Sequence, residues 1–213
     1  MKIAVVAANG NAGRRIVAEA VARGEEVTAV VRGENTTNAQ HSMQKDLMDL
    51  TTEDLAGFDV VVDAFGTWDP ATLGQHITTV AHLADILSGT DVRLVVVGGA
   101  GSLYVDPEHT LQLVDAPDFP AEFVPLADAQ RKQLDYLHGR DDVAWTFVSP
   151  AADFRVDGPR TGHYILGGDE LMANAQGESV VSYDDYAIAL VDEVERTGTP
   201  EAHIRERISV VSA

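Results

Sequence analysis

A glycine-containing loop near the amino terminus is the first group of residues whose spacing could do chemistry. The segment Ala8-Asn9-Gly10-Asn11-Ala12-Gly13 follows the apolar run Ile3–Ala7 and opens an amphipathic stretch. In that context a helix start can hold the pyrophosphate of a dinucleotide, because its first N–H groups have no internal partners. Gly10 would let the backbone approach the pyrophosphate, and Gly13 would let helix and strand pack closely. Ala7 replaces the first glycine of the usual triplet, which predicts a slightly different turn. An ordinary tight turn is the alternative.

The residue after the second apolar run bears on the choice of dinucleotide. Arg32 stands where NAD-specific proteins usually carry an acid that binds the ribose 2′-hydroxyl. The planar guanidinium suits a 2′-phosphate, so NADP(H) is preferred and NAD(H) is possible, with a solvated strand-end arginine as the alternative. Asp46 could accept a hydrogen bond from the adenine amino group, with Leu47 beside the ring. As a lone carboxylate, Asp46 could equally cap a helix.

The tyrosines bear on the type of reaction. Short-chain dehydrogenases use a tyrosine whose pKa is lowered by a lysine four residues later. No such pair occurs, since Tyr104, Tyr136, Tyr164, Tyr183 and Tyr186 are followed at that spacing by Glu108, Arg140, Gly168, Ala187 and Leu190. This disfavours alcohol dehydrogenation and favours hydride transfer to a flavin or quinone-like acceptor, where positioning supplies much of the rate. Flavin would then be a substrate and not a tightly bound cofactor.

Three side chains are candidates for catalytic or acceptor-orienting roles. Ser102 and Tyr104 could hydrogen-bond an acceptor, and Lys132 could lie near the cofactor from its helix, although structural or solvated roles are the alternatives. The seven histidines show neither a helical i, i+4 pair nor a ligand cluster, so no metal site is predicted.

The segment around residue 160 is a candidate substrate site. Arg155 and Arg160 could clamp a phosphate or carboxylate, and Tyr164 lies in the same segment. Surface pairing of these arginines with nearby aspartates is the alternative.

Composition limits the other function classes. The 213 residues are 45% hydrophobic and 23% charged, which fits one folded domain over residues 1–213. The absence of cysteine excludes disulfides and thiolate chemistry. A net charge of -19 argues against nucleic acid and anionic membrane surfaces as partners. We therefore expect a cytoplasmic monomer or homodimer whose partner is a small-molecule acceptor.

Apolar runs typical of buried strands alternate along the chain with segments of helical periodicity. This alternation predicts a doubly wound parallel sheet of the α/β class, which would position these residues. The pattern predicts a final strand, Ile204–Val211, at the sheet edge. Ser182 and Asp185 form a capping-box pattern at the start of the last helix. Substrate-side loops are expected near residues 102–125 and 151–182. The other predicted strands are Ile3–Ala7, Glu26–Val31, Met43–Lys45, Val60–Ala64, Leu94–Val97 and Trp145–Val148, and the helices are Ala12–Arg23, Thr72–Leu87, Leu126–Leu137 and Tyr183–Arg196.

Several motifs together resemble one family. The chain is similar to atypical short-chain dehydrogenase/reductases, in particular the small NADH-flavin reductases of the NAD(P)H-binding, NmrA-like class. The resemblance runs nearly end to end and rests on the glycine loop and on residues 97–103, 145–150, 160–164, 167–169, 182–187 and 203–205.

The resemblance implies a Rossmann fold and a set of cofactor-binding positions. Beyond Asn9–Gly13, Arg32 and Asp46, these are Phe65-Gly66-Thr67, with the nicotinamide near Gly98-Gly99 and Ser149-Pro150-Ala151. The implied activity is NAD(P)H-dependent reduction of a flavin or quinone-like acceptor. A non-catalytic NADP(H)-binding redox sensor and an NAD-dependent epimerase or dehydratase are the alternatives.

Overall fold

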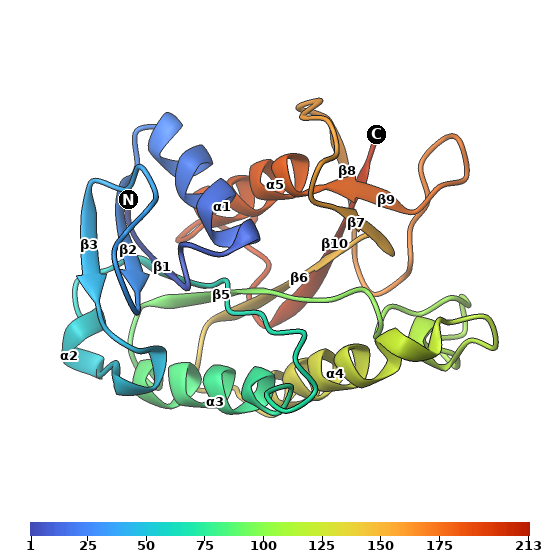
Figure 1. The fold of residues 1–213 in the computed structure, drawn as a ribbon, viewed down its shortest axis with the longest axis horizontal. Coiled ribbons are helices and arrows are strands. Elements are labelled where there is room, and N and C mark those ends of the chain that lie inside the picture. Colours follow the sequence, from blue (N-terminus) through green and yellow to red (C-terminus); the bar gives the residue numbers. More distant parts are fainter.

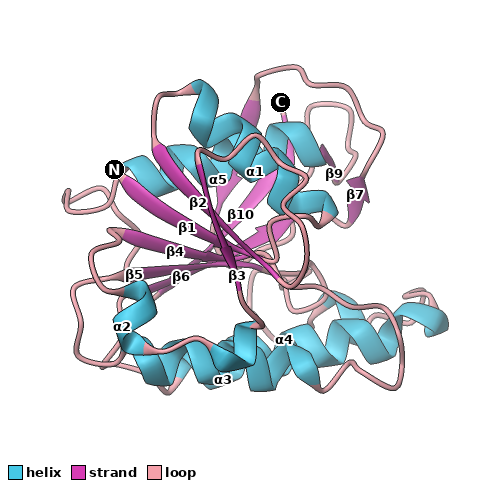
Figure 2. Cartoon of the chain, turned by 60° about the vertical axis from the view of Figure 1, so that its left-hand side comes forward, coloured by secondary structure: helices cyan, strands magenta, loops and turns pink.

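The computed structural model describes all 213 residues and places one large twisted sheet between two layers of helices (Figure 1, Figure 2). The sheet has eight strands in the order β3-β2-β1-β4-β5-β6-β10-β8. All neighbouring pairs are parallel except β10 with β8. The strands are β1 Lys2–Val6, β2 Glu26–Val31, β3 His41–Gln44, β4 Val60–Asp63, β5 Arg93–Val97, β6 Trp145–Pro150, β8 Tyr164–Gly167 and β10 Glu206–Ser212. This confirms the predicted Rossmann-type α/β class.

Each face of the sheet is covered by a different set of helices, which explains why the central strands are apolar on both faces. Helices α1 (Asn11–Ala22) and α5 (Tyr183–Glu195) pack on one face (Figure 1). Helices α3 (Gln75–Leu87) and α4 (Val124–His138), with the short α2 (Thr52–Leu55), cover the other. Two separate buried clusters result, one on each side of the sheet. No helix is long and apolar enough to cross a bilayer.

The prediction that the last strand forms the sheet edge was wrong. Strand β10 lies between β6 and β8, and β8 forms the edge by pairing antiparallel with it. Strand β8 lies within residues 151–182, where the sequence predicts a substrate-side loop. Strand β10 also begins at Glu206, after Arg205 adopts a left-handed conformation with a φ of 60°. Its interior position accounts for the burial of most of its residues.

The start of α5 shows a capping interaction that was only half predicted. The Ser182 hydroxyl accepts a hydrogen bond from the Asp185 N–H at 3.0 Å, as a helix cap should. The Asp185 carboxylate does not complete the expected capping box. It accepts instead from the N–H groups of Thr161 and Gly162, both at 2.9 Å, and from the Thr161 hydroxyl at 2.6 Å. Asp185 therefore fixes the start of β8 against α5.

A small second sheet extends the carboxyl end of β6. Strands β7 (Asp153–Arg155) and β9 (Val180–Ser182) pair in parallel beside the main sheet (Figure 2). The Phe154 ring stacks on Tyr183 with the ring centroids 3.7 Å apart. Arg15 of α1 donates to the Val156 carbonyl at 2.9 Å and pairs with Asp184 at 3.1 Å. The second sheet is thus held directly against the start of α1, where the glycine loop ends.

Candidate functional site

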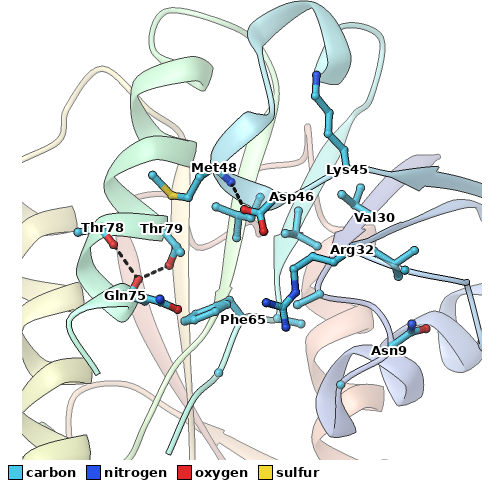
Figure 3. Close-up of a pocket in the computed structure, with 18 residues that line it drawn as sticks. Asn9, Val30, Arg32, Lys45, Asp46, Met48, Phe65, Gln75, Thr78 and Thr79 are labelled. Carbon is cyan, nitrogen blue, oxygen red and sulfur yellow. Dashed lines mark hydrogen bonds between the residues drawn. The ribbon is translucent and has the colours of Figure 1, made fainter. Parts of the chain in front are cut away.

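A groove of about 560 Å³ lies at the carboxyl edge of β1, β2 and β4 (Figure 3). Ligands of open α/β sheets bind at this edge because loops leave the strands there. Seven predicted cofactor residues line the groove: Asn9, Gly10, Arg32, Asp46, Leu47, Phe65 and Gly66. Ala8, Asn11, Ala12, Gly13, Thr67, Gly98, Gly99, Ser149, Pro150 and Ala151 do not line it.

The groove also contains side chains that sequence reasoning missed. Gln75, Thr78 and Thr79 line it from the first turns of α3, and Met48 lines it from the segment after β3. The i, i+3, i+4 spacing of the α3 residues is a signal that could have found them. It puts three polar side chains on one face of a helix that starts at the carboxyl edge.

The glycine loop is a tight turn whose geometry explains two of its residues. Ala7 adopts a left-handed conformation with a φ of 57°, and its carbonyl accepts from the Gly10 N–H at 2.9 Å. A Cβ atom at Gly13 would lie 2.7 Å from the Ala7 carbonyl oxygen and 2.9 Å from the Ala8 Cα. Any side chain at Gly13 would push α1 away from β1. Ala7, in the first glycine position, adopts its left-handed conformation at a cost of about 1–2 kcal/mol.

The first turn of α1 has N–H groups with no side-chain cap, and it starts beside the groove, which its N-cap Gly10 lines. Gly10 is the N-cap of α1, and no side chain caps this helix start. No acidic residue lies in the first turn, so nothing there opposes an anion. Backbone donors and the helix dipole both favour a phosphate at this position.

The loop after β2 is fixed to the glycine loop by one side chain. The Asn9 amide oxygen accepts from the Thr36 N–H at 3.0 Å and from the Thr36 hydroxyl at 2.9 Å. The Asn9 amide nitrogen donates to the Glu34 carbonyl at 2.8 Å. These bonds hold the backbone two and four residues beyond Arg32 against the glycine loop.

Arg32 points into the groove, and its guanidinium has no carboxylate partner (Figure 3). Lys45, by contrast, turns away and pairs with Asp54 of α2. Most arginines of this acidic chain are paired, so an unpaired guanidinium in a groove is unusual for it. Arg32 has the position and the free donors to bind an anionic group there.

Asp46 has a structural task at the groove. Its carboxylate accepts from the Met48 N–H at 3.0 Å and caps the short 3-10 turn Leu47–Asp49. This is the helix-cap alternative that the sequence left open. Leu47 is buried in the core beneath the groove. Their predicted contacts with an adenine ring stay predictions.

Two buried ionisable residues hold the loop after β4. The Asp63 carboxylate accepts from the Phe65 N–H at 3.0 Å, and its second oxygen has no partner. A ring nitrogen of His76 lies 3.2 Å from the Thr67 carbonyl, and its ring meets that of Phe65 edge to face. Burial raises the pKa of Asp63 to about 6 and lowers the pKa of His76. Burial therefore shifts both groups toward their neutral forms, although Asp63 still ionises above about pH 6.

We expect Asp63→Asn to stabilise the protein above pH 7. An unfolded carboxyl titrates near pH 4, so between about pH 4 and pH 6 the folded state holds a proton that the unfolded state has lost. Stability therefore falls as pH rises through this window. Asparagine keeps the acceptor for Phe65 and removes the titration, which should raise the free energy of unfolding by about 3 kcal/mol at pH 8 and little at pH 4.

Denaturant unfolding at pH 4 and pH 8 measures this difference. Asp91→Asn, at an exposed position just before β5, is the matched control and should leave both values unchanged. An equal loss of stability at both pH values would show that ionisation of Asp63 carries no cost in the folded state.

The glycines at the predicted nicotinamide end are explained by packing. A Cβ atom at Gly98 would overlap the Phe147 ring, and one at Gly99 would overlap the Gln130 side chain of α4. Ser149 is completely buried, and its hydroxyl has no hydrogen-bond partner. Pro150 and Ala151 are also buried. Cofactor contacts at these positions stay predictions.

Two of the candidate catalytic side chains, Ser102 and Tyr104, meet the guanidinium of Arg207 on β10. Arg207 of β10 donates to the Ser102 hydroxyl at 3.0 Å and to its carbonyl at 2.8 Å. The Tyr104 ring is stacked on His109 with centroids 4.5 Å apart. Lys132 is exposed on α4. Ser102 is therefore occupied as an anchor of its loop, and the catalytic roles of all three residues stay predictions.

The candidate substrate residues are each bonded to a carboxylate of this chain. Arg155 pairs with Asp153 at 2.6 Å, and Arg160 pairs with Glu19 of α1 at 2.9 Å. The Tyr164 hydroxyl donates to Asp192 of α5. The pair with Asp153 is the surface-pairing alternative for Arg155, whereas Arg160 pairs with the nearly buried Glu19 and not with an aspartate close in sequence. The structure does not bring the three together into one clamp.

The strand order, the uncapped helix start and the groove at the carboxyl edge define a Rossmann-type dinucleotide-binding protein. The sequence pattern of the NAD(P)H-binding family matches residues 7–197. The chain belongs to this family. The family resemblance inferred from the sequence motifs is confirmed.

Named relatives span the whole chain. YwnB of Bacillus subtilis is 46% identical over 215 residues, which cover 100% of this chain and 99% of YwnB. The crystal structure of a Streptococcus pneumoniae protein, provisionally named an NADH-flavin reductase, is 52% identical with a TM-score of 0.96 and 100% of both chains covered. The crystal structure of a Bacteroides thetaiotaomicron protein, provisionally named an epimerase, is 33% identical with a TM-score of 0.84. The match covers 99% of this chain and 96% of the Bacteroides chain.

Proposed function

We propose that this protein is an NADPH-dependent reductase that passes two electrons to a planar flavin or quinone-like acceptor. The observation that carries the cofactor preference is Arg32, whose unpaired guanidinium points into the groove at the end of β2. When bound, NADPH supplies a hydride, which together with one proton from water reduces the acceptor and leaves NADP⁺.

The residues fit such a dinucleotide at both of its phosphate positions. The free N–H groups at the start of α1 suit the pyrophosphate, and close packing at Gly13 keeps that helix start against β1. Arg32 suits a 2′-phosphate because its fork can donate two parallel hydrogen bonds. Asn9 holds the loop that carries Arg32 in place.

The tyrosines support an acceptor that needs no enzymatic general acid. Burial raises the pKa of Tyr164, Tyr183 and Tyr186, which is opposite to what a tyrosine acid requires. Tyr186 also donates its hydroxyl proton to the Val148 carbonyl at 2.7 Å. Tyr136 lies between α3 and α4, bonded to Arg140. A flavin or quinone ring accepts a hydride without a positioned proton donor, and the provisional name of the Streptococcus relative agrees with such an acceptor.

Anaerobic NADPH oxidation tests the proposal. We expect the absorbance of NADPH to fall on addition of riboflavin, FMN or a small naphthoquinone, and NADH to bind more weakly in parallel titrations. NADPH binding without turnover of any of these acceptors would contradict a reductase and favour the redox-sensor alternative.

A further inference from the structure

Trp68 is the most exposed large apolar side chain of the molecule, with 68% of its surface accessible. It lies in the segment between β4 and α3. Its only aromatic neighbour is Phe123, which is itself 43% exposed and meets it edge to face with centroids 6.0 Å apart. Leaving two large rings in water costs free energy unless something else covers them. We refer to Trp68 and Phe123 as the aromatic pair.

The segment that carries Trp68 is held in a fixed shape. The Thr67 carbonyl contacts the buried His76 ring, and the Thr67 hydroxyl bonds that of Thr72 at 2.7 Å. Asp69 accepts from the Ala71 N–H at 3.0 Å with its side chain and from the Thr72 N–H at 2.8 Å with its carbonyl. These bonds on both sides of Trp68 fix the backbone that carries its exposed ring, so a ligand that stacks on the ring need not order this segment.

The aromatic pair joins the two loops that the proposed reaction brings together. Trp68 follows Gly66, which lines the cofactor groove, by two residues. Phe123 ends the 3-10 turn Ala121–Phe123 that leads into α4, within the predicted acceptor-side loop 102–125. A ring bound at the pair would therefore lie between the cofactor segment and the acceptor loop.

We propose that the aromatic pair is the binding platform for the planar ring of the electron acceptor, with Trp68 stacking on that ring. This inference rests on the proposed function. The electron-rich indole suits an electron-poor ring system, whether an isoalloxazine or a naphthoquinone, and stacking needs no charged partner. Neither member of the pair contacts the groove that would hold the adenine half of the cofactor, so the pair acts on acceptor binding and not on NADPH binding.

Tryptophan fluorescence reports acceptor binding directly, because the chain has two tryptophans and Trp145 is only 1% exposed. FMN and a small naphthoquinone are titrated separately into the protein saturated with NADP⁺, which cannot turn over. We expect saturable quenching of the exposed tryptophan with at least one of them. In Trp68→Phe, where only the buried Trp145 emits, the amplitude of the saturable component should fall sharply.

Steady-state kinetics with NADPH separate this site from the cofactor site. We expect Trp68→Ala to raise the KM for the acceptor about tenfold and Trp68→Phe to raise it less than about threefold, because phenylalanine retains a stacking surface. The Kd for NADPH should stay within about twofold of the wild-type value. Ile165→Ala removes another exposed apolar side chain, on the edge strand β8, and should change neither constant.

Distinct results would overturn the inference. An unchanged acceptor KM in Trp68→Ala, or unchanged saturable quenching in Trp68→Phe, would place the acceptor elsewhere. An equal rise in the NADPH Kd would make Trp68 a cofactor contact. Conversion of a dimer to a monomer by Trp68→Ala in sedimentation would make the aromatic pair an interface between copies. Absence of turnover with intact, Trp68-dependent quenching would refute the reductase function alone and leave the binding site standing.

Discussion

Replacing Arg32 with glutamate should raise the Kd for NADPH about 100-fold and leave the Kd for NADH within about threefold of its wild-type value. The guanidinium points into the groove at the end of β2 and has no carboxylate partner. A charge-assisted bidentate bond to a phosphate contributes about 1.5–3 kcal/mol, and a carboxylate in its place adds repulsion. NADH lacks the 2′-phosphate, and its ribose hydroxyl can donate to the new carboxylate.

Parallel calorimetric titrations of NADPH and NADH measure the two constants. Lys2→Glu is the matched control, because it makes the same change in charge at an exposed position at the opposite end of β1. It should shift the NADPH Kd by less than about twofold at 0.15 M salt, where screening acts over about 8 Å. A similar loss for both dinucleotides in Arg32→Glu would mean that the arginine supports the groove and does not read the phosphate.

Replacing Arg93 with methionine should lower the free energy of unfolding by about 3–5 kcal/mol at pH 7. Arg93 starts β5 and is 1% exposed, and its partner Glu193 of α5 is completely buried. The guanidinium also donates to the Glu193 carbonyl at 2.9 Å and to the Thr146 hydroxyl at 2.6 Å. Without Arg93, the buried Glu193 carboxylate would lose its only buried cationic partner.

The neighbouring Arg196 provides a stringent control for this prediction. It pairs with the same carboxylate at 3.0 Å, but its side chain is 33% exposed. Arg196→Met should therefore cost less than about 1 kcal/mol. Urea unfolding of both variants measures the difference, and equal losses would show that burial of the pair does not determine its contribution.

The same pair predicts a dependence on pH. Burial alone would raise the pKa of Glu193, but hydrogen bonds from the His203 N–H and from Arg93 outweigh it and lower the pKa. A carboxylate with a lowered folded-state pKa stabilises the protein above its unfolded pKa and loses that contribution as pH falls. The acid-side loss should therefore be smaller in Arg93→Met than in the wild type.

The sequence by itself determined the features that depend on neighbouring residues. Apolar runs alternating with helical periods predict the parallel sheet, because periodicity reports burial directly. The glycine loop and Arg32 were placed correctly at the carboxyl edge, because each directly follows a strand. The Ser182 cap followed from a pattern spanning only one helical turn.

Only the tertiary structure decided which distant groups meet. Asp185 binds Thr161 across 24 residues of sequence, Arg93 binds Glu193 across 100, and Arg207 binds Ser102 across 105. Local patterns carry no record of such pairs, so the sequence predicts a capping box for Asp185 and leaves the role of Ser102 open between an acceptor contact and a structural bond. The edge position of β8 was also missed because it depends on a distant partner. The segment has no strong strand pattern of its own, and it forms a strand by pairing antiparallel with β10. These long-range bonds have one physical cause. Packing of the core brings polar groups from distant parts of the chain together, and burial strengthens the hydrogen bonds and ion pairs that they form.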